Sequence, residues 1–261
     1  MAIELAASTL FCLHKPLEEA LRDIAQAGTK CIELTDDGRH ALTEARVDML
    51  LELKEAHGLR YSLHAPFADV NIAAPDAHLR EAVLRRLEAS IRWASALEAE
   101  ALVFHPGAST ALEHFSPGEA WRLNMESVRR LVRFAEARGV SAMVENVPEP
   151  VPFLMRSVED FERFYDEVGL EVEMALDIAH AHLRGEVEEF LGRLGGRIGH
   201  IHVSDNHGGG DEHLRLGAGS IDWKGAMSAV EASPFEGWVV VESFEGVDES
   251  LRLLRRLLGR A

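Results

Sequence analysis

The stretch His200–Trp223, HIHVSDNHGGGDEHLRLGAGSIDW, joins a short apolar strand to a loop of unusual composition. Apolar residues alternate with other residues over 198–203, which is the pattern of a β-strand. Four histidines and three aspartates lie in this stretch, several of them among glycines. A solvated turn needs polar residues, but it does not need imidazoles at this density. The loop is therefore either a turn that is rich in histidine by chance or the rim of a site that binds a cation.

The apolar strand is one of eight short runs of β-forming residues along the chain. Their starts are separated by roughly 30 to 40 residues, which is the length of a βα unit. The eight runs are residues 3–5, 31–34, 61–63, 101–104, 142–144, 173–176, 200–203 and 238–241.

Amphipathic stretches with helix-start and helix-stop residues separate these runs. Residues 16–28 begin with proline and end with glycine, and residues 116–139 repeat this arrangement. Ser157 and Asp160 form a capping-box pattern at the start of a further helix, which should end at Gly169. Strands that alternate with helices predict an α/β fold with a parallel sheet, and eight strands predict one (β/α)8 TIM barrel over residues 1–261. An open doubly wound sheet is the alternative, but the glycine-rich turn that usually follows its first strand is missing.

The composition describes a globular protein with a sizeable core. Hydrophobic residues make up 47% of the chain, and the formal net charge is −17. This charge argues against a broad electrostatic surface for nucleic acid or anionic lipid, although bound cations can invert the sign locally. Cys12 and Cys31 form no CxxC pair and predict no disulfide. The N-terminus lacks a basic signal-peptide region and no apolar run approaches ~20 residues, so we expect a cytoplasmic protein without a membrane span.

Histidine, aspartate and glutamate residues lie where six consecutive predicted strands end. The active site of a TIM barrel lies at this end of the strands. Each residue alone has an ordinary explanation, such as a hydrogen-bonded core histidine, an ion pair, a helix cap or a solvated loop. Their coincidence favours a metal site, because burying several acids together costs several kcal/mol unless cations compensate. The candidate ligands are His64, His105, Glu145, Asp177, His180, His202, Asp211, His213 and Glu242. Nitrogen and oxygen ligands of this kind suit Zn²⁺ or Mn²⁺, and nine are enough for one to three divalent metal ions.

Several short motifs occur in a particular order along these strands. They are LHAPFADVNIA, HPG, EN, DxxHxxxxG from Asp177 to Gly185, HxxD from His202 to Asp205, and DEHLRLGAGSIDW. With these motifs the chain resembles the xylose isomerase-like TIM-barrel superfamily. This superfamily includes sugar isomerases, 3-epimerases, sugar phosphate isomerase/epimerase proteins and endonuclease IV.

The resemblance to the one-metal epimerases implies a divalent ion held by Glu145, Asp177, His202 and Glu242. It also implies that Glu145 and Glu242 transfer a proton at a metal-bound enediolate, while His180 contacts the substrate. The expected catalytic residues are thus Glu145, Glu242 and His180. The expected function is a metal-dependent isomerase or epimerase acting on a small sugar or sugar phosphate. Val147 stands where the xylose isomerases proper have a lysine, so a lysine-assisted hydride shift is not expected.

The resemblance to endonuclease IV implies a trinuclear zinc phosphodiesterase as the alternative. Its three ligand groups would be His64, His105 and Glu145; Glu145, Asp177, His202 and Glu242; and His180, Asp211 and His213. A nucleic acid would be a partner only under this alternative. Arg39 and Phe67 are then the candidates to enter the minor groove of DNA. The sequence shows no track of basic residues with interleaved aromatic residues beside them. A non-catalytic metal-binding barrel is a third hypothesis.

For some residues near the candidate site the sequence predicts a role less specifically. Asn146, Asp205 and His182 could orient ligands through hydrogen bonds. His200 is expected to face the surrounding helices, and no role is predicted for His207. Arg215 and Lys224 are expected to be exposed and solvated. The sequence makes no prediction of the oligomeric state.

Overall fold

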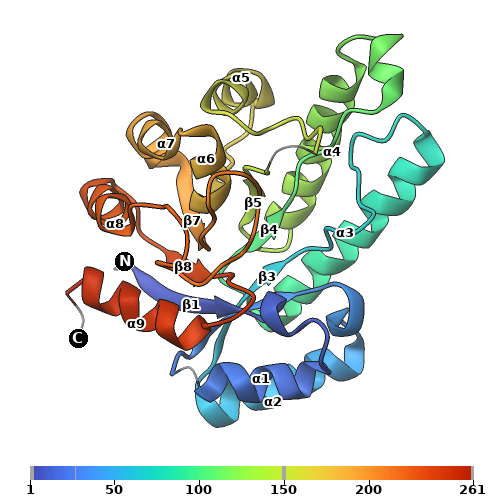
Figure 1. Ribbon diagram of the computed structural model, residues 1–261. Helices are drawn as coiled ribbons and strands as arrows, with labels where there is room; N and C mark the ends of the chain where they lie inside the picture. The colour runs from blue at the N-terminus through green and yellow to red at the C-terminus, as the bar shows by residue number, and fades with distance from the viewer. Residues whose placement is uncertain (1–2, 27, 149–150, 260–261) are drawn as a thin grey trace.

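A computed structural model describes residues 3–26, 28–148 and 151–259. Its strands are all parallel and close into a barrel in chain order, with the first strand paired to the last. The strands lie at the centre of the molecule and the helices surround them (Figure 1). The bounds are β1 Glu4–Ser8, β2 Cys31–Thr35, β3 Arg60–His64, β4 Leu102–Phe104, β5 Ala142–Glu145, β6 Met174–Asp177, β7 Ile198–Val203 and β8 Trp238–Val241. The predicted TIM barrel is confirmed, and each predicted run contributes a strand.

The helices follow the strands, and several of them begin at a residue whose side chain caps the helix. Their bounds are α1 Leu17–Gln26, α2 Glu44–His57, α3 Ala77–Leu97, α4 Glu119–Glu136, α5 Val158–Val168, α6 Ile178–Arg184, α7 Val187–Leu194, α8 Trp223–Ala232 and α9 Val247–Leu257. The predicted capping box is confirmed, because Ser157 and Asp160 each accept a backbone N–H of the other at the start of α5. Asp177 caps α6 by accepting the backbone N–H of His180 at 2.8 Å. This cap fixes the side chain of the last residue of β6.

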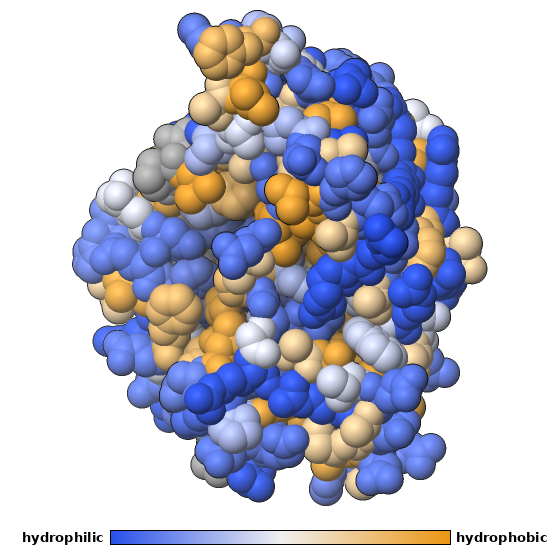
Figure 2. Space-filling model, turned by 90° about the vertical axis from the view of Figure 1, so that its right-hand side faces the viewer, coloured by the Kyte–Doolittle hydropathy of each residue, from blue (hydrophilic) through white to orange (hydrophobic). Residues whose placement is uncertain are grey.

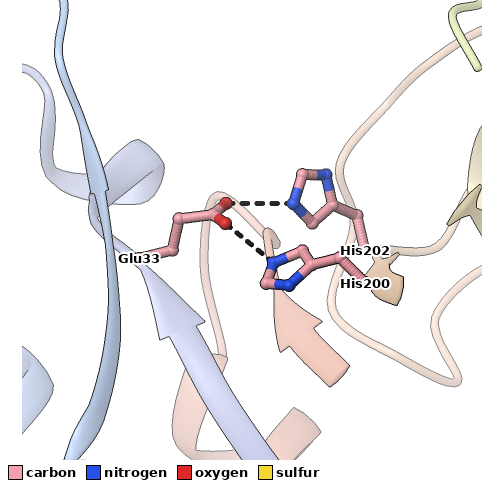
Figure 3. A group of neighbouring side chains, drawn as sticks. All are labelled: Glu33, His200 and His202. Atoms are coloured by element: carbon pink, nitrogen blue, oxygen red, sulfur yellow. Dashed lines mark hydrogen bonds and ion pairs between the residues drawn. The ribbon is translucent and has the colours of Figure 1, made fainter. Parts of the chain in front are cut away.

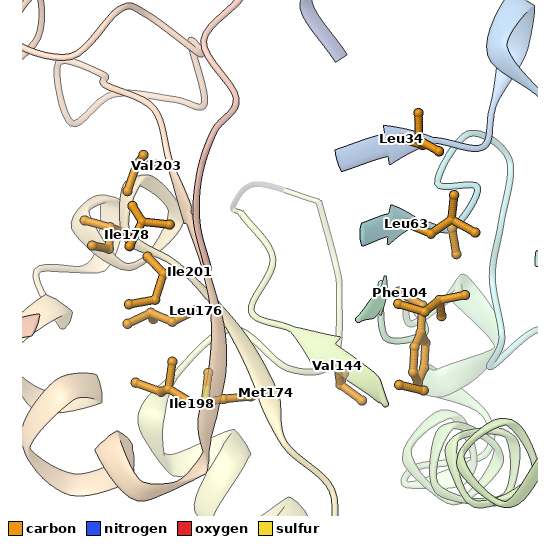
Figure 4. Close-up of a cluster of buried hydrophobic side chains, with 14 of the residues drawn as sticks. Leu34, Leu63, Phe104, Val144, Met174, Leu176, Ile178, Ile198, Ile201 and Val203 are labelled. Atoms are coloured by element: carbon orange, nitrogen blue, oxygen red, sulfur yellow. The ribbon is translucent and has the colours of Figure 1, made fainter. Parts of the chain in front are cut away.

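Apolar side chains on the outer face of the strands pack against the helices. Figure 4 labels part of this layer: Leu34, Leu63, Phe104, Val144, Met174, Leu176, Ile198, Ile201 and Val203 of the strands, with Ile178 of α6 packed against them. Successive side chains of a strand point to opposite faces, so the residues between these positions point into the barrel. Each strand thus supplies alternate residues to the core layer and to the interior.

The interior of the barrel changes from apolar to polar along the strands. Two small clusters fill part of it: Ala6, Cys31, Trp238 and Val240, and Ala101, Val103, Met143 and Ala175. Glu33, Ser62 and His200 are buried in the interior as well. The expectation that His200 faces the helices is wrong. Residues two apart in a strand share a face, so His200 points inward with His202. Cys12 and Cys31 are buried and form no disulfide, as predicted.

The loops that follow the strands project beyond the barrel. Figure 2 shows an apolar projection at the top of one face, at the height where Figure 1 draws the segment between β4 and α4. Its exposed large apolar side chains are Leu112 and Phe115. Within the described ranges, no helix has the length and apolar character to cross a membrane.

Candidate metal centre

Glu145, the last residue of β5, is the point where several side chains meet. Its Oε2 lies 3.1 Å from Nε2 of His64 and 3.1 Å from Nε2 of His105. Its other oxygen, Oε1, lies 2.9 Å from Nδ1 of His202. The side chain is 1% exposed, so its charge is compensated by these neighbours and not by water. Both carboxylate oxygens are thus in contact with imidazole nitrogens that could face a common cation.

A second group shares Glu145 and lies deeper in the barrel. Ligand atoms of Glu145, Asp177, His202 and Glu242 all lie within 4.8 Å of one another. Nδ1 of His202 is 3.5 Å from Oε2 of Glu242, and all four residues are buried. Oδ1 of Asp177 caps α6, whereas its buried Oδ2 has no hydrogen-bond partner among the described residues. A buried carboxylate oxygen without a partner is costly unless a cation satisfies it.

A third group, His180, Asp211 and His213, combines α6 with the loop after β7. Oδ2 of Asp211 lies 3.3 Å from Nε2 of His180 and 3.0 Å from Nε2 of His213. Gly208 has a φ of 82°, a conformation that favours glycine, and lies where the loop turns before Asp211. The buried Oδ1 of Asp211 has no hydrogen-bond partner in the described part of the chain. The nine sequence-predicted residues therefore assemble into the three groups that the resemblance implied, while their roles as ligands stay predictions.

The imidazoles are held so that one particular nitrogen faces the carboxylates. Nδ1 of His64 donates to the carbonyl of Ala65 at 2.7 Å, and Nδ1 of His180 donates to the carbonyl of Asn146 at 2.8 Å. Nδ1 of His213 donates in the same way to the carbonyl of Glu242 at 2.9 Å. A neutral imidazole that donates through Nδ1 leaves a lone pair on Nε2. This arrangement is typical of histidines that bind metal ions.

Asn146 holds two of the candidate ligands together. Its side-chain oxygen accepts the backbone N–H of Asp177 at 2.7 Å, and its amide nitrogen donates to the carbonyl of Asp177 at 3.0 Å. Its own carbonyl accepts from His180. The expectation that Asn146 orients ligands agrees with these contacts, which join the ends of β5 and β6 to α6.

Asp205 organises the loop that returns Asp211 and His213 to the barrel. Its carboxylate accepts the backbone N–H of Gly217 at 2.8 Å and the indole N–H of Trp223 at 2.8 Å, and it is fully buried. Asp205 therefore acts through the loop and not on a ligand directly.

The other residues singled out in the sequence lie farther from the three groups. His182 contacts the hydroxyl of Ser220 at 3.0 Å, and the exposed His207 contacts Glu212 at 3.0 Å. Arg215, Lys224 and Arg39 are exposed. Phe67 instead lines the cavity described below.

The two glutamates of the centre, Glu145 and Glu242, differ in pKa because their neighbours differ. The pKa of Glu242 is raised to about 7, because burial and the charges of Glu33 and Glu145 together outweigh the opposing effect of His202. Burial acts in the same direction on Glu145, but contact with His202, His105 and His64 holds its pKa well below the usual value. Glu242 is thus the carboxylate that exchanges protons near neutral pH, and Glu145 stays ionised.

The donor set fits one or more divalent metal ions. Imidazole nitrogens and carboxylate oxygens, without thiolates, match Zn²⁺ and Mn²⁺. The free oxygens of Asp177 and Asp211 supply donor atoms that no described residue uses. Glu145 contributes an oxygen to two groups, as a bridging carboxylate would.

A cavity of about 250 Å³ opens above these groups. Its floor includes His64, His105, Glu145, His180, Asp211, His213 and Glu242. Its wall includes Leu10, Phe67, Pro148, Phe153 and Phe244. No lysine or arginine is among the described residues that line it. The volume is below the range of ~300–1,000 Å³ typical of drug-sized ligands, so the cavity suits a small molecule.

The sequence reasoning missed Glu33 and the aromatic wall. Glu33 is fully buried in β2 and contacts both His200 and His202. The stretch CIELT carried a signal, because Cys31, Glu33 and Thr35 alternate with apolar residues and must share the inner face. Phe153 and Phe244 lie outside the strands, where periodicity does not predict position.

Comparison with known proteins agrees with the expected resemblance. The sequence model of the family described as a xylose isomerase-like TIM barrel matches residues 21–257. A solved D-tagatose 3-epimerase-like protein is 26% identical, with a TM-score of 0.92 over 98% of this chain and 97% of that one. Fructoselysine 3-epimerase of Shigella flexneri is 23% identical over 88% of this chain and 87% of its own length. A probable endonuclease 4 of Mycobacterium ulcerans is 25% identical over 78% of this chain and 81% of its own length.

Proposed function

The chain belongs to the family of xylose isomerase-like TIM barrels, and from this premise we propose that it is a divalent-metal-dependent sugar isomerase or epimerase. The observation that carries the proposal is the convergence of Glu145, Asp177, His202 and Glu242, of which Glu145 and Glu242 line a small cavity. The similarity to a D-tagatose 3-epimerase-like protein and to a fructoselysine 3-epimerase supports a sugar as the substrate.

Glu145 and Glu242 are the residues that we propose to move the proton. A bound divalent ion would polarise the carbonyl of the substrate and so acidify the neighbouring C–H. One carboxylate removes that proton, and the other delivers a proton to the opposite face of the same carbon. Without metal Glu242 is the more readily protonated of the two, and a bound ion would lower its pKa from about 7 toward the ionised form that accepts a proton. His180, which lines the cavity, is proposed to hydrogen-bond the substrate.

An uncharged sugar suits the cavity better than a sugar phosphate. Phosphate groups are usually bound by arginine, lysine or helix N-termini. The described lining has no basic side chain, and one wall is formed by Phe67, Phe153 and Phe244. Aromatic and aliphatic side chains of this kind can pack against the C–H face of a sugar. We therefore propose an uncharged ketose or related small sugar, with Zn²⁺ or Mn²⁺ as the ion.

A trinuclear phosphodiesterase is the second candidate, because the third group of His180, Asp211 and His213 is complete. Three ions at one site can activate water and neutralise phosphoryl oxygens together. The similarity to a probable endonuclease 4 agrees with this candidate. The net charge of −17 argues against an extended positively charged surface that would bind a DNA backbone.

An activity panel separates the two candidates. Purified protein loaded with Mn²⁺ or Zn²⁺ is incubated with a set of ketoses and, in parallel, with a duplex that contains an abasic site. We expect interconversion of at least one ketose, incorporation of solvent deuterium at the epimerised carbon, and no cleavage of the duplex. Cleavage of the duplex without turnover of any sugar would replace the first candidate by the second.

The third group provides a matched variant for the same panel. Asp211→Asn removes one candidate ligand but leaves Glu145 and Glu242 in place. A phosphodiesterase that needs three ions loses its activity in this variant. An epimerase, in which Glu145 and Glu242 move protons to and from the sugar carbon, should lose less of its activity in this variant.

A further inference from the structure

We propose that Glu33, a buried residue of β2, positions His202 so that Nδ1 of this imidazole faces the metal ion. Glu33 lies below the candidate ligands and does not line the cavity. It therefore acts through His202 and not on the substrate. The inference rests on the proposed metal-dependent function, since it concerns how one ligand is held.

Glu33 joins two histidines of β7 across the interior of the barrel (Figure 3). Its Oε1 lies 3.0 Å from Nε2 of His202, and its Oε2 lies 2.9 Å from Nε2 of His200. Ser62 of β3 donates to the same Oε2 at 3.0 Å. The carboxylate is fully buried, so these three groups take the place of water. Oε2 accepts hydrogen bonds from Ser62 and His200, whereas Oε1 has the ion-pair contact with His202 and no hydrogen-bond partner among the described residues. A buried carboxylate oxygen of this kind favours a protonated nitrogen beside it.

The contacts of His202 determine which of its nitrogens carries the proton. Each nitrogen of His202 lies beside a carboxylate, Nδ1 beside Glu145 and Nε2 beside Glu33. An ion held by Glu145 and Glu242 would take the lone pair of Nδ1, and the proton of the ring then lies on Nε2, beside Glu33. The contact of Nε2 with Oε1 is short, although its direction departs from that of a good hydrogen bond, and we describe it as an ion-pair contact. With the proton on Nε2, Nδ1 keeps a lone pair. Nδ1 is the atom that lies 2.9 Å from Glu145 and 3.5 Å from Glu242.

His202 differs in this respect from the other oriented histidines of the centre. His64, His180 and His213 donate through Nδ1 to neutral backbone carbonyls, and their Nε2 atoms face the carboxylates. His202 is turned the other way, and its outer partner is a charged carboxylate. A carboxylate partner makes the opposite nitrogen a stronger ligand and fixes the plane of the ring.

A separate metal ion bound by Glu33, His200 and His202 is the competing explanation, because their ligand atoms also lie within 4.8 Å of one another. Oε2 of Glu33 already accepts hydrogen bonds from Nε2 of His200 at 2.9 Å and from Ser62 at 3.0 Å. A separate ion would therefore have only Oε1 of Glu33 and Nε2 of His202 as donors without a hydrogen-bond partner among the described residues. Two donors are fewer than the three or four protein ligands of a typical zinc site.

The test compares Glu33→Gln with Asp36→Asn in zinc binding. Both substitutions neutralise a fully buried carboxylate at nearly constant size, and the side chain of Asp36 pairs with Arg86 and belongs to none of the candidate ligand groups. Zinc affinity is measured by competition with a chromophoric chelator, and ions per chain by mass spectrometry. We expect Glu33→Gln to weaken zinc binding ~10–100-fold with an unchanged number of ions, and Asp36→Asn to change it less than ~3-fold.

Two results would overturn the inference. One is a zinc affinity of Glu33→Gln equal to that of the control variant. The other is the loss of one ion per chain with unchanged affinity for the rest, which would identify a separate metal site. A wild-type protein that binds no divalent ion refutes the proposed function itself, and this is established before any variant is compared.

A measurement on the unaltered protein does not depend on whether Glu33→Gln folds. Long-range ¹H–¹⁵N spectra of the zinc-loaded wild-type protein report which nitrogen of each histidine carries a proton. The signals of His202 are assigned from their absence in His202→Gln. We expect a protonated Nε2 and a metal-bound Nδ1, and a proton on Nδ1 would contradict the assignment.

Discussion

At the scale of single residues, the two glutamates of the candidate metal centre differ in which protonation state their surroundings favour. Glu145 is held ionised by three imidazoles, whereas the burial of Glu242 favours its neutral form. Two carboxylates that lie close together but differ in pKa are the arrangement that general acid–base catalysis requires. The difference arises from their contacts, since both are buried glutamates at the ends of strands.

Replacing Glu145 tests this asymmetry most directly. Glu145→Gln removes the proposed proton-transfer group and the charge of the residue that two candidate ligand groups share, so we expect activity to fall at least ~100-fold. The measurement is the steady-state rate on the substrate identified in the panel, at saturating metal. Glu52→Gln, an exposed position on α2, is the control. An activity within twofold of that control would show that Glu145 takes no part in the reaction.

At the scale of elements, the sequence predicted the strands well because each strand of a barrel is a short buried run between polar segments. The ligand candidates were predictable for the same reason, since His64 and Glu145 end β3 and β5, and His105 follows β4 directly. The positions and contacts of polar residues inside a strand were harder to predict. His200 was assigned to the wrong face and Glu33 was missed, because one polar residue in an apolar run does not reveal its partner 167 residues away.

The long loop between β7 and α8 depends on one buried carboxylate. Asp205 accepts hydrogen bonds from both ends of the loop, and Asp205→Asn removes its charge and an acceptor oxygen. We expect the free energy of unfolding to fall by ~2 kcal/mol and metal binding by His180, Asp211 and His213 to weaken. Denaturant titration and metal content provide the measurements.

Asp222→Asn is the matched control for this prediction. Asp222 lies in the same segment and caps α8, a role that asparagine also fills. Equal effects of the two substitutions would show that Asp205 has no special part in the loop.

At the scale of the whole molecule, the stability should depend on metal and pH together. In the metal-free protein burial lowers the pKa values of His64, His180 and His213, but nearby carboxylates outweigh it and raise them to about 9, 10 and 9. A raised pKa stabilises the folded state below the unfolded value of ~6.5, and this contribution is lost as the pH rises through the folded values. Metal ions compete with these protons and bind more tightly in the same range of pH.

The increase in melting temperature caused by zinc should therefore be larger at pH 8.5 than at pH 6.5. The same zinc concentration, ~100 times the dissociation constant at pH 8.5, is used at both pH values. We expect an increase of ~5–10 °C at pH 8.5 and a smaller one at pH 6.5. Thermal unfolding is followed with zinc and with a chelator at both pH values. An effect of zinc that is equal at the two pH values, or larger at pH 6.5, would contradict the pairing of these histidines with carboxylates.

The barrel brings together acids and imidazoles from six strands and the loops that follow them. The central claim of the proposal is that bound cations allow these groups to be buried together at one end. Metal content per chain, measured by mass spectrometry on freshly purified protein and on Glu145→Gln, tests this claim most directly. We predict one to three zinc or manganese ions in the wild-type protein and a clear loss in the variant. A wild-type protein without metal, which also takes up none when zinc or manganese is supplied, would contradict the account.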